Sequence, residues 1–332
     1  MSQFPVVVIG ASAGGVSVLL ELAQALPSGF PAVIAVALHV GKQRSILPAL
    51  MSERGPLPAM HPQDGEVPRP GTIYVAPPDH HLLLSPTALR LSRGPRENHA
   101  RPAIDPMFRT AALGWRERAI GVVLSGTLDD GTAGLVAIKD CGGTAIVQDP
   151  ATAIEPGMPA SAMANVKVDH CLAVADIVPM LQRLVGQPHA SAPTQPAGYL
   201  LREQSVFEGN QNMSETISQL AALGPASGLT CPECGGGLWE VSPARPLRYR
   251  CHTGHAYSAL TLESAQVEVA GHALQSSLRS LQERELLLLR LASVAEATGD
   301  AAQAAAGRKQ AERVHEQARA LAKMIEEQAV GA

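Results

Sequence analysis

The chain of 332 residues has 46% hydrophobic and 17% charged residues and a formal net charge of −4, a composition typical of a packed globular protein. This balance gives no sequence-wide basic field to attract nucleic acid, and no apolar run approaches the roughly 20 residues that span a bilayer. The N-terminus lacks the basic start of a signal peptide, and five cysteines, three of them in one short segment, disfavour a disulfide framework. We therefore expect a cytoplasmic protein with neither a nucleic-acid partner nor direct membrane insertion.

Short apolar runs alternate with helical patterns between Val6 and about Val185. The runs cover residues 6–10, 32–40, 72–77, 119–126 and 144–149. They contain few polar residues, which is typical of strands buried on both faces of a parallel sheet. Because helical patterns separate them, we predict an α/β fold with a doubly wound, mostly parallel sheet. We assign residues 1–187 to this domain.

A candidate nucleophile, Ser12, follows the first of these strands. Gly10-Ala11-Ser12-Ala13-Gly14 fits the G-x-S-x-G pattern of a sharp strand-to-helix turn that exposes a serine hydroxyl, and the next helix points its N-terminus at the same place, which favours an oxyanion. A dinucleotide fingerprint would need glycine at Ser12 and an acid at His39. A P-loop would need lysine where Val16 stands. Taken alone, the loop is equally consistent with a serine that caps a helix.

The partners of a catalytic serine are also present at strand ends. His39 ends the second apolar run, so it should lie at the same carboxyl edge of the sheet and could act as a general base. Asp129 and Asp130 follow another central strand, and either carboxylate could orient the imidazole. Each residue also has a structural alternative, either a hydrogen-bonded histidine at a strand end or a turn aspartate before Gly131. Residue patterns leave the choice between the two acids open.

Six motifs together resemble those of the CheB-type protein-glutamate methylesterases. They are Ile9-Gly10-Ala11-Ser12-Ala13-Gly14-Gly15, His39, Tyr74-Val75-Ala76-Pro77-Pro78-Asp79, Arg101-Pro102-Ala103-Ile104-Asp105, Ser125-Gly126 with Asp130-Gly131, and Gly157-Met158-Pro159. The resemblance covers residues 5 to about 185, in order and at family spacing. It implies a cofactor-free Ser-His-Asp triad with Ser12 as nucleophile, His39 as base and Asp130 as orienting acid, while Asp129 fills a variable position. Thr127 stands where the family often has methionine, and its backbone N–H is a candidate oxyanion donor.

The resemblance also implies a function in chemotactic signal transduction. Such an enzyme removes methyl esters from glutamate side chains of methyl-accepting chemotaxis receptors, or of related chemosensory proteins, and it can deamidate receptor glutamines. Family members usually carry a receiver domain of two-component systems before the esterase. Here the first strand begins at Val6, so we expect no control by a receiver domain in the same chain. The alternatives are a non-catalytic chemosensory adaptor that retains the fold and an esterase that acts on another small ester.

A second candidate site is a zinc knuckle over residues 226–258. Cys231, Cys234, Cys251 and His255 follow a C-x2-C…C-x3-H pattern, the Cys₃His set of structural Zn²⁺ sites. His252 is an alternative ligand, and a redox pair at Cys231 and Cys234 would leave the other two residues unexplained. The segment resembles an extension of some stand-alone CheB-type proteins. Because the triad lies in another predicted domain, we expect esterase activity to be independent of the metal.

The remaining segments are predicted to be a linker and a helical hairpin. Residues 186–198 are rich in Pro, Ala and Ser, which is typical of linkers, and we place the linker at 188–225. Residues 259–332 carry two helical patterns separated by Thr298-Gly299-Asp300, which can serve as a C-cap and an N-cap. Their apolar stripes can pair within the chain, with a receptor's helices or with a second copy, so a homodimer through these helices is one expectation.

Overall fold

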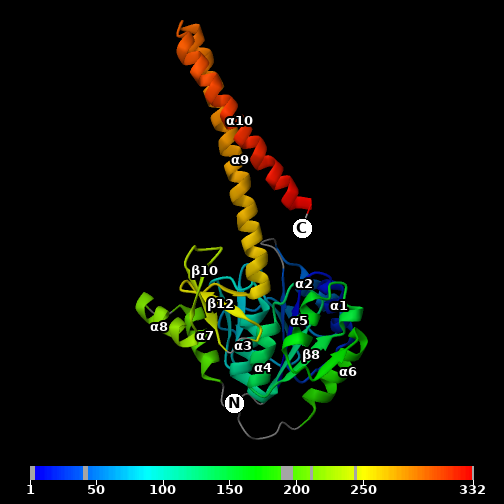
Figure 1. The fold of residues 1–332 in the computed structure, drawn as a ribbon. Coiled ribbons are helices and arrows are strands. Elements are labelled where there is room, and N and C mark those ends of the chain that lie inside the picture. Colours follow the sequence, from blue (N-terminus) through cyan, green and yellow to red (C-terminus); the bar gives the residue numbers. More distant parts are fainter. Residues whose placement is uncertain (1–3, 40–43, 188–196, 210–211, 243–244, 331–332) are drawn as a thin grey trace. The chain divides into compact units, whose positions relative to one another are not determined.

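The computed structural model describes residues 4–39, 44–187, 197–209, 212–242 and 245–330 (Figure 1). The chain forms two compact units, Met1–Leu262 and Glu263–Ala332. No helix of the described residues is long and apolar enough to cross a membrane.

The larger unit is built on a seven-stranded sheet whose paired strands all run parallel. In spatial order the strands are β3 (Ala59–Met60), β4 (Ile73–Val75), β2 (Val33–Leu38), β1 (Val6–Ala11), β7 (Ala119–Val123), β8 (Thr144–Gln148) and β9 (His170–Leu172). The chain winds outward from β1 in both directions, so the strand order reverses beside β1 and β7. Ligand sites of open α/β sheets lie at such a reversal. The predicted doubly wound sheet is confirmed.

Helices cover both faces of this sheet (Figure 1). The helices are α1 (Gly15–Ala25), α2 (Leu47–Arg54) and α6 (Val174–Val185) on one face, and α3 (Ile104–Trp115), α4 (Thr132–Asp140) and α5 (Gly157–Asn165) on the other. Along β1, Val6 and Val8 belong to one core while Val7 and Ile9 belong to the other. Because both faces are buried, the strands are apolar throughout rather than alternating. The short edge strands β3 and β9, and the antiparallel hairpin β5 (His81–Leu84) and β6 (Leu89–Ser92), were not predicted.

Two helices occupy much of the segment that the sequence predicted as a linker. They are α7 (Gly198–Glu208) and α8 (Met213–Leu223), so the prediction of a linker over 188–225 is wrong for these two helices; residues 188–196 and 210–211 lie outside the described part. Phe207 is buried in α7, and a capping box between Asn212 and Glu215 begins α8. The composition that suggested a linker is confined to the residues before α7.

A four-stranded antiparallel sheet follows α8, and we call it the ribbon. Its strands are β10 (Ala226–Thr230), β11 (Gly237–Val241), β12 (Arg248–Cys251) and β13 (Ala256–Ser258). The ribbon belongs to the same compact unit as the parallel sheet, whereas the sequence led us to expect a separate domain. Backbone hydrogen bonds join the two: the Ala256 N–H donates to Arg96 O at 3.2 Å, and the Asn98 N–H donates to Ala256 O at 2.8 Å.

Four buried charged residues, Glu97, Arg109, Glu203 and Arg250, and the partly buried Arg248 connect the parallel-sheet region with α7 and the ribbon. Arg109 of α3 donates two hydrogen bonds to Glu97, at 2.8 and 3.1 Å. Arg250 of β12 donates to Glu97 at 2.8 Å and to Glu203 of α7 at 2.9 Å. Arg248 also donates to Glu203, at 2.6 Å. Burial raises the pKa of Glu203, but the guanidinium groups around it outweigh burial and hold that pKa below its ordinary value. Glu203 is therefore ionised and paired.

The smaller unit consists of most of α9 (Ala259–Ala297), whose first turn belongs to the larger unit, and of α10 (Ala301–Val330). The predicted hairpin is confirmed, including its caps: Gly299 has φ of 85°, and Asp300 Oδ1 accepts from the Gln303 N–H at 2.9 Å. The buried face carries mainly small side chains, namely Ala292, Ala295, Ala304, Ala311, Val314 and Ala318. Val267 and Leu291, two apolar residues of α9, are more than half exposed. Homodimerisation through these helices stays a prediction.

We expect Glu203→Gln to destabilise the larger unit by about 3–5 kcal/mol, because it leaves buried guanidinium groups without their counter-charge. Urea unfolding followed by circular dichroism gives the free energy of unfolding. Glu53→Gln, which changes an exposed residue of α2 in the same way, should alter that free energy by less than about 0.5 kcal/mol. Equal free energies for the two variants would show that the buried network does not stabilise the fold.

Candidate active site and metal centre

Ser12 lies in the tight turn between β1 and α1. Its N–H donates to Ser125 O at 2.9 Å, which ties the turn to the loop after β7. Gly14 has φ of 75° and caps α1, a conformation that favours glycine. A Cβ atom on Gly126 would lie 2.8 Å from the Ser12 Cβ and 2.1 Å from the Met158 sulfur. Glycine at this position therefore lets the loop after β7 approach the serine closely.

His39, directly after β2, bridges Ser12 and Asp130. Its Nδ1 lies 3.1 Å from Ser12 Oγ, and its Nε2 lies 2.7 Å from Asp130 Oδ2. The carboxylate can only accept a hydrogen bond, so Nε2 carries the hydrogen and Nδ1 is left to accept the serine hydroxyl. His39 is partly exposed, whereas Asp130 is buried. The three predicted triad residues thus meet at the ends of β1, β2 and β7.

Asp130 also receives backbone hydrogen bonds. Its carboxylate accepts from the N–H groups of Ile104 at 2.7 Å and Asp105 at 3.2 Å, which begin α3, and from Gly131 at 3.0 Å. The positive end of the α3 dipole therefore faces this carboxylate. Burial raises the pKa of Asp130, but the hydrogen bond and charge of His39, together with the Ile104 N–H, outweigh burial and lower the pKa below its ordinary value. Asp130 is thus an ionised carboxylate.

Asp105 is a second buried carboxyl beside the first. Its Oδ1 accepts from the N–H groups of Gly131 at 3.0 Å and Gly134 at 2.6 Å, at the start of α4. Asp130, in the loop before α4, therefore caps α3, and Asp105, in the first turn of α3, caps α4. Burial and the charge of Asp130 raise the pKa of Asp105 well above its ordinary value. The surroundings therefore shift the pKa values of the two acids in opposite directions, so that only Asp130 readily carries a charge.

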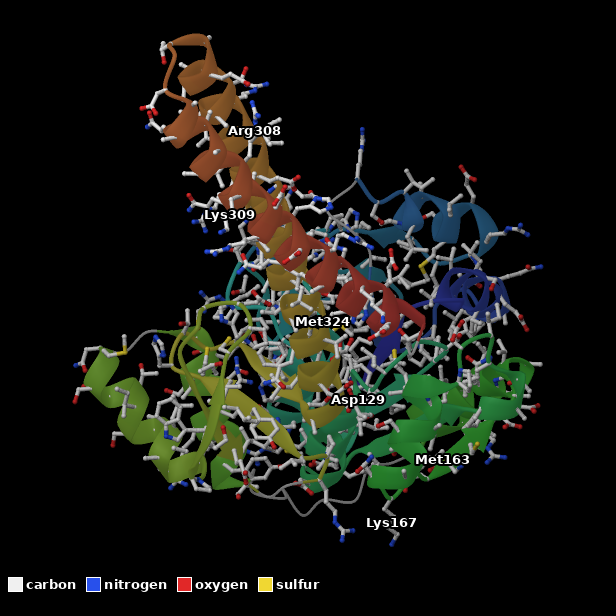
Figure 2. The ribbon with its side chains drawn as sticks, turned by 45° about the horizontal axis from the view of Figure 1, so that its top comes forward. Asp129, Met163, Lys167, Arg308, Lys309 and Met324 are labelled. Atoms are coloured by element: carbon white, nitrogen blue, oxygen red, sulfur yellow. The ribbon has the colours of Figure 1, made fainter. Side chains whose placement is uncertain are left out.

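Asp129 does not contact His39 through any hydrogen bond of the described structure. Its Oδ1 accepts from Ser258 Oγ at 2.6 Å, beside the start of α9 (Figure 2). Burial raises the pKa of Asp129 to about 6, although the Ser258 hydrogen bond lowers it, and the charge of Asp130 adds to the increase. Of the two acids that residue patterns left open, the structure places Asp130 against the histidine.

Asn98 is a residue of this site that the sequence reasoning missed. Its Nδ2 donates to Asp130 Oδ1 at 2.8 Å and to Asp105 Oδ2 at 2.9 Å. A lone asparagine in a loop resembles a turn residue, and φ of 52° at Asn98 fits that description equally well. No signal in the residues alone separates the two roles.

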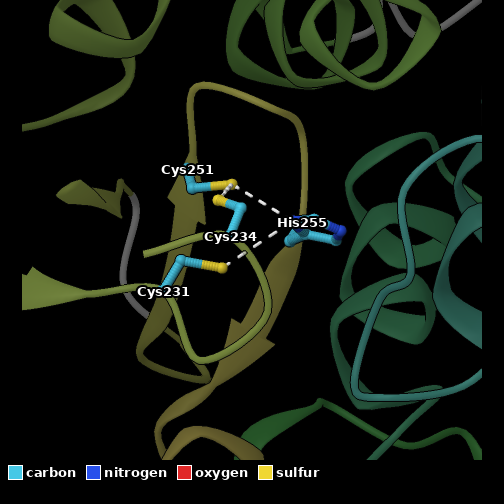
Figure 3. A group of neighbouring side chains, drawn as sticks. All are labelled: Cys231, Cys234, Cys251 and His255. Atoms are coloured by element: carbon cyan, nitrogen blue, oxygen red, sulfur yellow. Dashed lines mark hydrogen bonds between the residues drawn. The ribbon is translucent and has the colours of Figure 1, made fainter. Parts of the chain in front are cut away.

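The predicted metal ligands converge in the ribbon (Figure 3). Ligand atoms of Cys231, Cys234, Cys251 and His255 all lie within 4.8 Å of one another. The Cys234 and Cys251 sulfurs are 3.6 Å apart, and His255 Nδ1 lies 3.7 Å from the Cys231 sulfur and 3.5 Å from the Cys251 sulfur. A tetrahedral Zn²⁺ with Cys and His ligands has S–S and S–N separations of about 3.7 and 3.5 Å. The donor set therefore fits this ion.

The surroundings of His255 also fit a metal ligand. Its Nε2 lies 3.2 Å from Glu233 Oε2, the carboxylate contact that commonly orients a ligating histidine. His252, the alternative ligand, lies against Gly236, where an added Cβ would be 2.5 Å from its Nδ1, and it is not a member of the cluster. The Cys231–Cys234 redox pair, in turn, would leave the convergence of Cys251 and His255 unexplained.

The sequence profile of the family described as CheB methylesterase matches residues 7–181. A Leptospira interrogans protein with the provisional name of protein-glutamate methylesterase/protein-glutamine glutaminase is 36% identical over 188 residues, which are 55% of this chain and 95% of that protein. A Bordetella avium protein named protein-glutamate methylesterase/protein-glutamine glutaminase 1 is 39% identical over 184 residues, which are 55% of this chain and 54% of that protein.

A similar solved structure is the crystal structure of the Thermotoga maritima CheB methylesterase catalytic domain. It superposes with a TM-score of 0.53 at 33% sequence identity and covers 55% of this chain and all of that domain. The profile match spans more than half of the chain and includes Ser12, His39 and Asp130. The chain belongs to the CheB methylesterase family.

Proposed function

We propose that this chain hydrolyses glutamate γ-methyl esters of methyl-accepting chemotaxis receptors to carboxylate and methanol. The observation that carries the proposal is the hydrogen-bonded series Ser12–His39–Asp130, with contacts of 3.1 and 2.7 Å, inside a domain whose relatives are named protein-glutamate methylesterases. A serine polarised by a carboxylate-held histidine is suited to acyl transfer. A cytoplasmic location remains part of this proposal.

In the proposed reaction, Ser12 Oγ attacks the ester carbonyl while His39 Nδ1 takes the hydroxyl proton. The tetrahedral intermediate expels methoxide, which leaves as methanol with the proton from Nδ1, and an acyl-enzyme remains on Ser12. Water then attacks the acyl group with His39 again as the base, which releases the glutamate carboxylate. Asp130 holds the ring and stabilises the imidazolium in both steps.

Backbone donors must stabilise the oxyanion in each step. The N–H groups of Ser12 and Gly126 already donate to Ser125 O and Glu155 O, at 2.9 Å each, so neither is free for that role. The N–H of Thr127 and the N-terminus of α1 are our candidates. The same machinery can release ammonia from a glutamine amide, and the names of the relatives include a glutaminase. Receptor deamidation is therefore a second proposed reaction of this site.

We expect Ser12→Ala and His39→Ala each to lower turnover by several orders of magnitude, since losses reach about 10⁶-fold when a triad member is removed from a serine protease. The measurement is methanol release from methylated receptor. Ser28→Ala, which changes an exposed serine, is the matched control and should release methanol at the wild-type rate. Methanol release by Ser12→Ala at that rate would refute a serine mechanism.

Asp130→Asn should lower kcat by about 10⁴-fold, as in a protease whose triad aspartate is changed to asparagine. Asp129→Asn should change kcat little, because its partner is Ser258 and not His39. A larger loss of kcat in Asp129→Asn than in Asp130→Asn would exchange the roles of the two acids.

Asp129→Asn should also change how stability depends on pH. A carboxyl group whose pKa is raised to about 6 by folding stabilises the fold fully only below its unfolded pKa, and this contribution is lost as pH rises through about 6. Asparagine stays neutral, so the variant should unfold at a higher urea concentration than wild type at pH 8. The two proteins should unfold at similar urea concentrations near pH 4.

We further propose that Cys231, Cys234, Cys251 and His255 hold one structural zinc ion. All four positions of a tetrahedral ion would then be filled by protein atoms, which is typical of structural sites rather than catalytic ones. Under this proposal the ribbon of residues 226–258 is a zinc knuckle that remains attached to the esterase.

We expect elemental analysis of protein purified without chelator to find about one zinc per chain. Cys234→Ser should lose the zinc and melt at a lower temperature, because metal binding contributes directly to folding of such modules. Cys171→Ser changes an exposed cysteine outside the cluster and should retain both the zinc and the melting temperature. Zinc-free wild type with a melting curve unaffected by chelator would exclude a structural site.

A further inference from the structure

Both the NH₂ group and the carbonyl oxygen of the Asn98 side chain form hydrogen bonds. Its NH₂ group donates to carboxylates of Asp130 and Asp105, at 2.8 and 2.9 Å. Its Oδ1 accepts from the Ser258 backbone N–H and from the Thr261 hydroxyl, at 3.0 Å each. The ionised Asp130 carboxylate cannot donate and the Ser258 backbone N–H cannot accept, so these contacts permit only one orientation of the amide. Asn98 therefore connects two distinct parts of the chain.

One contact to the Asn98 carbonyl oxygen comes from the last residue of the ribbon and the other from the first turn of the helix that follows it. Ser258 ends β13 and Thr261 lies in the first turn of α9, where the Thr261 N–H donates to Ser258 Oγ at 3.0 Å. His255 directly precedes β13, and the Cys251 N–H donates to His255 O at 3.0 Å. An ion that holds Cys251 and His255 thus fixes the strand whose end holds Asn98.

The backbone of Asn98 is also fixed from the other side. The adjacent Glu97 is fully buried and paired with Arg109 of α3 and Arg250 of β12, at 2.8 Å each. The Asn98 N–H donates to Ala256 O at 2.8 Å. The amide therefore has little freedom to move away from Asp130 while the ribbon is folded.

We propose that Asn98 is a positioning residue for the Ser12–His39–Asp130 triad and that the folded ribbon keeps it in place, so that the reactivity of Ser12 depends on the zinc knuckle. This inference rests on the proposed serine mechanism. It reverses the expectation from the sequence that activity is independent of the metal, because the ribbon does not form a separate domain.

The physical consequence concerns the charge on Asp130. The titratable groups that interact with it are His39, His81, Asp105 and Asp129, and ionisation of either neighbouring acid would oppose the charge on Asp130. Asn98 supplies a neutral donor on the side that faces Asp105. The Asn98 hydrogen bond lowers the pKa of Asp130. Without that donor the pKa of Asp130 is higher, so the ionised carboxylate that holds the His39 ring is less populated at a given pH.

The test uses Asn98→Gly and Thr261→Val in the full-length, zinc-loaded protein. Glycine tolerates the positive φ at residue 98, and valine keeps the shape of threonine without its hydroxyl. We expect Asn98→Gly to lower kcat roughly 10- to 100-fold, the usual loss when a hydrogen-bond partner behind a functional residue is removed. KM should be nearly unchanged, and the acid limb of the pH profile of kcat/KM should move to higher pH. Thr261→Val should show the same changes to a smaller extent.

Labelling of Ser12 by a small fluorophosphonate, followed by mass spectrometry, provides a readout that does not depend on the receptor. Its rate should fall in Asn98→Gly, in Thr261→Val and in the zinc-free Cys234→Ser variant. Thr261→Ser keeps the hydroxyl and should label at the wild-type rate, as should the exposed-cysteine control Cys171→Ser. Circular dichroism and zinc content identify any variant that has lost the fold instead.

The outcomes separate this inference from the proposed function. Wild type that labels at Ser12 but releases no methanol from receptor would refute the substrate alone, and the labelling rates would still test the role of Asn98. Labelling of folded Asn98→Gly at the wild-type rate with an unmoved acid limb would overturn the inference. Equal labelling rates for Thr261→Val and Thr261→Ser would remove the Thr261 hydroxyl from the inference, and labelling of folded Cys234→Ser at the wild-type rate would remove the ribbon.

Discussion

The arrangement of the active site depends on one buried carboxylate, that of Asp130. Removing an ionised group from water is tolerated only when hydrogen bonds and opposite charge replace the water. Here the replacement comes from the first turn of α3, from the Gly131 N–H, from Asn98 and from His39. The ring orientation of His39, the point at which α3 begins and the position of the loop at residue 98 all follow from satisfying one charge.

The two helix caps, in which Asp130 caps α3 and Asp105 caps α4, fix the geometry of the site. Because of these caps, the two helices begin at fixed positions relative to the strand ends beneath them. Ser12 and His39 lie at the ends of the neighbouring strands β1 and β2, whose register is set by backbone pairing along their whole length. The Ser12–His39 distance is therefore determined by the sheet, and the His39–Asp130 distance by the helix starts.

Patterns in the sequence predicted features that follow from local rules. Strands buried on both faces are apolar throughout, and parallel strands end at one edge, so the fold and the meeting of Ser12 with His39 were predictable. Asp129 and Asp130 are adjacent and chemically identical, and only the family resemblance favoured the second. Glu203 and Arg250 would ordinarily be exposed; their burial depends on partners that lie far away in sequence. For the same reason the composition before α7 could not reveal that α7 packs on α3 and that α8 packs on α7 and β11.

The buried charges have a consequence for how this chain can be divided. The family match ends at residue 181, but the compact unit continues to Leu262, and partners of Glu97 and Arg109 come from that later stretch. A chimaera that joined residues 1–187 to another module would retain Glu97 and Arg109 but lose Glu203 and Arg250, together with the Phe207 ring that lies 5.4 Å from the Arg109 guanidinium carbon. The segment that defines the family is thus shorter than the compact unit that contains the partners of its own buried charges.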